Sequence, residues 1–76
     1  MTYTIEIFDA AQQDLAQLER VVAARVIKKL RSICENPLHF LEHLEGYALW
    51  KLRIGDHRAV IQLDEHNQIL NVLALI

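Results

Sequence analysis

The sequence predicts an α+β domain in which a helical hairpin packs on a mainly antiparallel four-stranded sheet, in the order βααβββ. Three observations support this fold class. Residues 3–8 alternate as a strand does, residues 10–34 carry two apolar helical stripes, and residues 48–76 form strand-like segments separated by turn residues. A chain of 76 residues without an internal repeat or linker fits a single domain, residues 1–76.

The first half of the chain predicts one strand and two helices. Residues 3–8 form the strand, and Asp9 offers an N-cap for a helix that begins at about Ala10. The residues that this helix is expected to bury are Ala11, Leu15 and Leu18. A second helix is expected from about Glu19 to Cys34, and its apolar stripe consists of Val22, Val26, Leu30 and Ile33.

The second half begins where "ENP", residues 35–37, ends the second helix, because the residue before a proline is disfavoured in helical conformation. The segment "LHFLEHLEG", residues 38–46, is then a loop or a short helix. Near the end of the chain, "DEHNQ" makes a turn before "ILNVLALI", residues 69–76. That nearly continuous apolar run is typical of a strand in the middle of a sheet or buried on both faces.

Between these segments, "ALWKLRIGDHRAVIQLDE", residues 48–65, predicts a β-hairpin. If the Gly-Asp dipeptide at 55–56 is its two-residue turn, Arg53 stands directly opposite Arg58. Like charges in this position destabilise a sheet by roughly 0.2 to 1 kcal/mol. Lys51 lies one pleat further along the same face, so three cations gather there.

Side chains two residues apart share a face of a sheet, and this parity divides the hairpin into two sets. The set expected to face the core is Ala48, Trp50, Leu52, Ile54, His57, Ala59, Ile61 and Leu63. The other set, with three cations and one amide, is Leu49, Lys51, Arg53, Arg58, Val60 and Gln62. We expect this second face to look outward, toward an anion, since adjacent arginines can grip a phosphate. Ordinary solvated side chains on an open sheet face are the alternative.

Composition excludes several classes of protein. A net charge of -2 does not suit a protein that coats nucleic acid by its overall charge. The single cysteine, Cys34, cannot form an internal disulfide, and its apolar neighbours predict core packing. No segment is apolar over the length of a membrane span, and the N-terminus does not resemble a secretion signal. We therefore expect no membrane association and a cytoplasmic location.

Histidines and the tryptophan leave alternatives open. His39 and His43 are four residues apart, but without a third ligand of clear position we expect no metal site, and no residue pattern calls for a cofactor. His57 could act as a general base, although its parity favours a partly buried structural role. Trp50 could stack on a nucleic-acid base, but its parity favours the core.

The order of elements and the hairpin motif resemble the RelE/ParE superfamily of bacterial and archaeal toxin proteins. Its hallmark has the form L-x-G, then basic-Leu-Arg, then Gly-Asp-aromatic-Arg-hydrophobic. The matching residues are Leu44, Gly46, Lys51, Leu52, Arg53, Gly55, Asp56 and Arg58. His57 stands where the superfamily usually has tyrosine, and the resemblance extends over essentially the whole chain.

In the RelE branch the resemblance implies an endonuclease that cuts messenger RNA in the ribosomal A site and is neutralised by a cognate antitoxin. A ribose 2′-hydroxyl would attack the neighbouring phosphate without a metal. Arg53 and Arg58 would hold and stabilise the phosphate, with Lys51 as a proton donor or base. Gln62 and the helix cations Arg25, Lys28, Lys29 and Arg31 would contact RNA, although the helix cations could equally meet acidic antitoxin residues or remain solvated. A homodimer or a toxin–antitoxin hetero-oligomer is expected.

Two departures from the RelE pattern bear on activity. Leu49 lies where that pattern can carry another lysine. RelE members also continue into a short tail with an arginine and a tyrosine, whereas this sequence ends at Ile76, so weak or absent cleavage is expected of it. The alternatives are a ParE-like inhibitor of DNA gyrase, which needs no catalytic residues, and a degenerate toxin fold that only binds an antitoxin.

Overall fold

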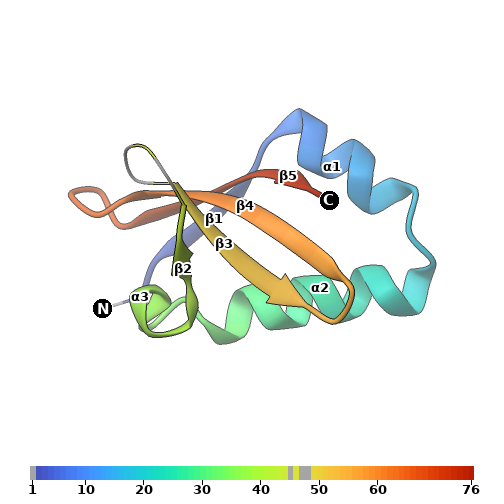
Figure 1. Ribbon diagram of the computed structural model, residues 1–76, viewed down its shortest axis with the longest axis horizontal. Helices are drawn as coiled ribbons and strands as arrows, with labels where there is room; N and C mark the ends of the chain where they lie inside the picture. Colours follow the sequence, from blue (N-terminus) through green and yellow to red (C-terminus); the bar gives the residue numbers. More distant parts are fainter. Residues whose placement is uncertain (1, 45, 47–48) are drawn as a thin grey trace.

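The computed structural model describes residues 2–44, 46 and 49–76, and it has the predicted α+β architecture (Figure 1). The sheet contains five strands rather than four, because a short strand precedes the hairpin. The elements in chain order are β1 (Thr4–Ile7), α1 (Asp9–Ala16), α2 (Arg20–Ser32), α3 (Pro37–Phe40), β2 (Glu42–His43), β3 (Leu49–Ile54), β4 (His57–Asp64) and β5 (Ile69–Leu75).

The strands lie in the order β1-β5-β4-β3-β2. Only β1 and β5 are parallel, and the other neighbours are antiparallel. The last strand thus lies between β1 and β4, which confirms the mid-sheet position predicted from its apolar sequence. A register shift between Val60 and Ile61 marks a bulge, and it moves the pairing of β4 with β5 by one residue.

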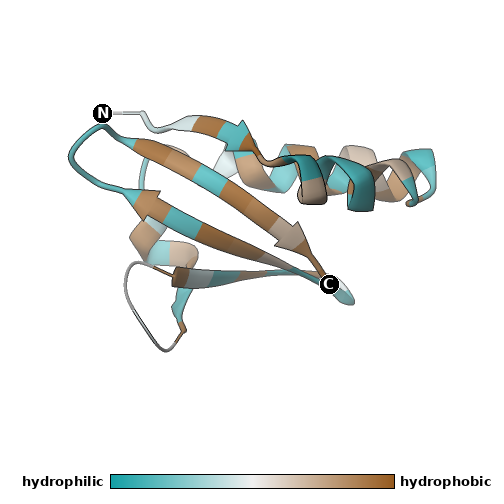
Figure 2. Cartoon of the chain, turned by 90° about the horizontal axis from the view of Figure 1, so that it is seen from above, coloured by the Kyte–Doolittle hydropathy of each residue, from teal (hydrophilic) through white to brown (hydrophobic). Residues whose placement is uncertain are grey.

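Helices α1 and α2 pack on one face of the sheet, and the chain joins them at the end of the molecule where the β3–β4 turn lies (Figures 1 and 2). The apolar side chains of α2 that enter the core are Val26 and Leu30, and Ala11 enters from α1. They meet the buried hairpin residues of the parity predicted for the core, which are Leu52, Ile54, Ala59, Ile61 and Leu63, and with them Leu70 and Val72 of β5. Ala48, which the same prediction placed in the core, lies outside the described residues. Trp50 also packs against this core, as predicted.

The start of α1 corrects one prediction. The N-cap is Phe8, not Asp9, and it makes no side-chain cap hydrogen bond. The reason is that the β1 ladder continues one residue further: the Phe8 amide donates to the Val72 carbonyl over 2.9 Å, which keeps Phe8 extended. Asp9 instead occupies the first helical turn, where its carboxylate is favourably placed near the positive end of the helix dipole.

Side-chain contacts secure the ends of α1 and α2. The Leu75 amide in β5 donates to Asp14 Oδ2 over 3.0 Å, which ties α1 to the centre of the sheet. Past the end of α2, Cys34 is buried and its Sγ donates to the Leu30 carbonyl over 3.2 Å. Its burial confirms the predicted packing role and raises the pKa of the thiol.

The turns that flank β4 have clear physical causes. In the β3–β4 turn, Gly55 has φ of +59° and Asp56 a negative φ, the pattern of a type II′ turn that matches the twist of the strands. In the β4–β5 turn, side-chain and backbone donors of Asn67 lower the pKa of the Asp64 carboxyl. Within the described residues, no helix has both the length and the apolar character needed to cross a membrane.

Candidate functional site

The face of the sheet opposite the helices carries the predicted arginine pair. Arg53 in β3 and Arg58 in β4 are direct register partners, and both side chains are exposed. The Gly-Asp turn lies immediately beyond them and sets this register. We call the surface formed by Leu49, Lys51, Arg53, Arg58, Val60, Gln62 and Asn71 the open face.

Backbone contacts hold the arginine pair in place. Arg58 exchanges two hydrogen bonds with Ile76, of 2.9 and 2.8 Å, so it is paired on both sides, by β3 and by the end of the chain. Arg53 Nε donates to the Gly55 carbonyl over 3.4 Å, which draws its guanidinium toward the turn. Within the described part of the chain, the ion pair present does not include either arginine. Their charges are therefore available to an anionic ligand.

Lys51 lies on the open face but has a carboxylate beside it. Its Nζ is 3.4 Å from Glu42 Oε2, and the register pairs these two residues across β2 and β3. The Lys51 side chain is 27% exposed and that of Glu42 is 74% exposed. The sequence reasoning missed Glu42, because a two-residue strand has no periodicity from which its pairing could be read.

Gln62 is also exposed on the open face, and it has a partner that the sequence reasoning missed. Asn71 Nδ2 donates to Gln62 Oε1 over 3.3 Å, across register partners in β5 and β4. Asn71 is only 9% exposed, in contrast to Gln62. The signal that could have found it is the lone polar residue within the apolar run "ILNVLALI".

The helix cations lie on another part of the molecule. Helix α2 carries five basic and no acidic residues, and Arg25, Lys28 and Arg31 are exposed. Lys29 differs from them, because it is half-buried with its Nζ 5.4 Å from the centre of the Phe40 ring. Since α2 packs on the core face, these cations do not join the arginine pair in one continuous site.

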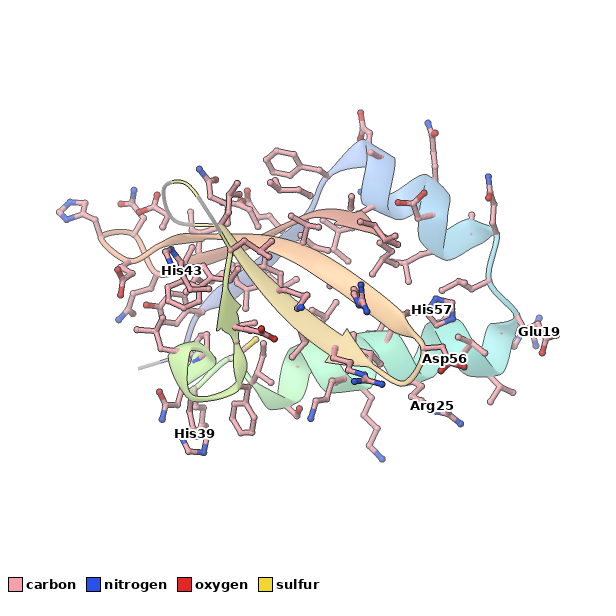
Figure 3. All side chains as sticks on the ribbon, viewed as in Figure 1. Glu19, Arg25, His39, His43, Asp56 and His57 are labelled. Atoms are coloured by element: carbon pink, nitrogen blue, oxygen red, sulfur yellow. The ribbon has the colours of Figure 1, made fainter. Side chains whose placement is uncertain are left out.

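Around the β3–β4 turn, Arg25, Asp56 and His57 gather beside the start of α2 (Figure 3). They line a cleft of about 180 Å³ whose apolar walls are Val22, Val26 and Ile54. His57 is half-buried on the core side of the hairpin, which confirms the parity-based prediction. Its position opposite the open face does not favour a role as the general base there.

The remaining histidines lie on separate elements. His39 is on α3 and His43 on β2, and Figure 3 shows them well apart. The His43 ring packs against Trp50 with 4.7 Å between ring centres. Trp50 packs against the core, which favours the predicted core role over stacking on a nucleic-acid base. Among the described residues, no three metal-ligating side chains come together.

A comparison with known protein families shows which family this chain belongs to. A family profile described as the ParE toxin of the type II toxin–antitoxin system parDE matches residues 5–76. The chain belongs to this ParE toxin family. The resemblance to the RelE/ParE superfamily seen in the sequence is therefore confirmed, and the protein is a toxin of the type II toxin–antitoxin class. A sequence search of curated proteins found no match.

Solved structures share the fold of this ParE-family toxin. The RelBE2 toxin–antitoxin complex from Mycobacterium tuberculosis has a TM-score of 0.90 at 20% identity, with 99% of this chain and 96% of that chain covered. The archaeal RelE–RelB complex from Pyrococcus horikoshii has a TM-score of 0.84 at 23% identity, covering 99% and 93%. The free R81A/R83A mutant of E. coli RelE gives 0.83 at 22% identity, covering 99% and 82%.

Proposed function

We propose that this toxin is a ribosome-dependent endonuclease that cleaves messenger RNA with the open face of its sheet. The observation that carries the proposal is the exposed, register-paired arginines Arg53 and Arg58, which have no carboxylate partner among the described residues. Two like charges side by side destabilise the free protein. A phosphate between them removes that repulsion, and arginine binds phosphate with paired, directional hydrogen bonds.

The chemistry that suits this site needs no metal. The ribose 2′-hydroxyl attacks the adjacent phosphorus while the bond to the 5′-oxygen breaks. The products are a 2′,3′-cyclic phosphate and a free 5′-hydroxyl. Negative charge builds up on the phosphoryl oxygens in the transition state, and donors fixed in advance stabilise that charge most effectively. Arg53 and Arg58 supply such donors on a hydrogen-bonded sheet.

The ion pair beside the arginines supplies groups that move protons. The Lys51 ammonium donates a proton to the leaving 5′-oxygen, and the Glu42 carboxylate accepts the proton released by the 2′-hydroxyl. Each such group contributes typically about 100- to 10,000-fold to a rate. The 3.4 Å contact between them keeps both groups at one edge of the open face.

Partners follow from the same proposal. The basic outer surface of α2 contacts ribosomal RNA, where exposed arginine and lysine side chains bind phosphates. A cognate antitoxin neutralises the toxin in the cytoplasm, in a hetero-oligomer like the RelBE2 and RelE–RelB complexes whose folds are similar. A homodimer of the toxin is the other assembly that we consider.

A second function is favoured by the description of the matching family as the ParE toxin. A ParE-like toxin would inhibit DNA gyrase by binding, and the open face would then contact protein or DNA without proton transfer. Antitoxin binding alone, by a fold without activity, is the third candidate.

The deciding experiment adds purified toxin to translating ribosomes and maps the ends of the messenger RNA fragments. We expect weak cleavage in the A site, with 2′,3′-cyclic phosphate on upstream fragments and 5′-hydroxyl on downstream ones. Arg58→Ala is the control and should give no fragments. Intact messenger RNA, together with inhibition of gyrase supercoiling by the same preparation, would replace the endonuclease with the ParE-like function.

A further inference from the structure

The amide pair of the open face lies beyond the groups assigned to phosphate chemistry. Gln62 is four residues from Arg58 on β4, so the two side chains share a face and are about 13 Å apart along the strand. Asn71 is nine-tenths buried beside Gln62 and directs its Nδ2 at Gln62 Oε1. A buried amide that orients an exposed one is an arrangement suited to recognition rather than to solubility.

The hydrogen bond fixes which part of Gln62 faces outward. Because Oε1 accepts from Asn71, the free end of the Gln62 amide is Nε2 with its two N–H donors. Side-chain amides recognise nucleobases through such donors and acceptors, and single-stranded RNA exposes the base edges that they can reach.

The surroundings of Gln62 suit a base rather than a phosphate. Val60 lies between Gln62 and the arginine end, and Leu49 is the register partner of Gln62 in β3. Val60 and Leu49 are both half-buried. They form an apolar floor on which a base can rest. Beyond Gln62 the face becomes acidic, with Asp64 on β4 and Glu6 on β1 next to Asn71. Phosphates are therefore attracted to the arginine end and repelled at the amide end.

We propose that Gln62, oriented by Asn71, is a specificity-determining residue that reads a base of the bound RNA and favours guanine and uracil, which carry a carbonyl oxygen (O6 or O4) where adenine and cytosine carry an amino group. Guanine and uracil present a carbonyl acceptor to the two N–H donors. Adenine and cytosine present an amino group at the corresponding position, and two donors cannot pair. The inference rests on the proposed RNA substrate, and it adds the class of base that the open face selects.

The test measures binding, so that it does not depend on cleavage. The ligands are four RNA hexamers whose 2′-hydroxyl groups are methylated, so that they lack the nucleophile. Each hexamer carries a single base, A, C, G or U, and is abasic at its other positions. Fluorescence anisotropy at low salt should show guanine and uracil bound about five- to tenfold more tightly than adenine and cytosine, the effect of about one hydrogen bond. Failure of messenger RNA cleavage would thus leave this result standing as base recognition without catalysis.

Variants of Gln62 and Asn71 distinguish base recognition from a purely structural role of these two amides. Gln62→Glu keeps the shape and the acceptor for Asn71, but it presents oxygen outward and should reverse the preference toward adenine and cytosine. Asn71→Asp should turn the Gln62 amide over and reverse it in the same direction. Gln62→Ala should abolish the preference, whereas Gln13→Ala, an exposed glutamine on α1, should retain it. Equal affinities for the four hexamers in the unmodified toxin, or an unchanged ratio in Gln62→Glu, would overturn the proposal.

Discussion

Arg58 combines a fixed backbone with an uncompensated charge. Its main chain lies between β3 on one side and Ile76 on the other, so its Cα stays directly opposite that of Arg53. The repulsion between the two guanidinium groups is thus built into the free protein. Sites in which such strain persists are often those that a ligand completes.

Removing one charge should therefore stabilise the fold. We expect Arg58→Ala to raise the free energy of unfolding by up to about 1 kcal/mol. A gain of that size raises Tm by about 4–8 °C in a small domain. Arg58→Lys keeps the charge and should leave Tm nearly unchanged. Thermal unfolding followed by circular dichroism gives both values. If Arg58→Ala melts lower than Arg58→Lys, the arginine stabilises the free protein and the strain argument is wrong.

Residues of the site differ in how far the sequence could predict them. The pairing of Arg53 with Arg58 follows from the Gly-Asp turn and was predicted correctly. Glu42 and Asn71 depend on pairings that the local pattern does not encode. Glu42 lies on a two-residue strand, and Asn71 lies in an apolar run whose pattern predicts only a strand in mid-sheet or buried on both faces.

At the scale of elements, the β3–β4 hairpin determines the geometry of the open face. Its turn has one residue with positive φ, Gly55, and the strands leave it in the register that aligns the arginines. A shift of one residue would move every side chain of the hairpin to the other face. The turn is therefore the element whose change should affect stability and function together.

Replacing Gly55 by alanine tests whether stability and function both depend on the turn. No atom lies within 4 Å of an added Cβ, so the cost comes from the positive φ alone, about 1–2 kcal/mol. We expect Gly55→Ala to lower Tm and to reduce messenger RNA cleavage. Asp56→Ala is the matched control at the second turn position and should change neither strongly. Full stability in Gly55→Ala would mean that the left-handed conformation does not hold the register.

Other elements show why local sequence patterns predict only part of the fold. The periodic helices and the hairpin were predicted, because apolar spacing and turn chemistry are local signals. The start of α1 was predicted one residue too late, since the β1 ladder extends through Phe8 and overrides the capping preference of Asp9. The extra strand β2 exists only through its pairing with β3.

In the whole molecule, the sheet separates two basic surfaces. The arginine pair lies on the open face, while Arg25, Lys28 and Arg31 lie on the outer side of α2, which packs on the opposite face. The proposed function gives these surfaces different tasks. In it the open face would stabilise the transition state, whereas the helix surface would attract RNA through counterion release.

In the proposed function, the open-face arginines act in the chemical step. The direct measurement is the single-turnover cleavage rate on ribosome complexes as a function of toxin concentration. Two double variants that each lose two positive charges are compared with the unmodified toxin. One is Arg53→Gln with Arg58→Gln, and the other is Lys28→Gln with Arg31→Gln.

We expect the open-face variant to lose about 100- to 1,000-fold in rate at saturating toxin, because fixed donors to a transition state are removed. The helix variant should reach the normal saturated rate at a higher toxin concentration, because it loses affinity alone. A helix variant that lost the saturated rate, while the open-face variant kept it, would contradict the claim and assign the chemistry to α2.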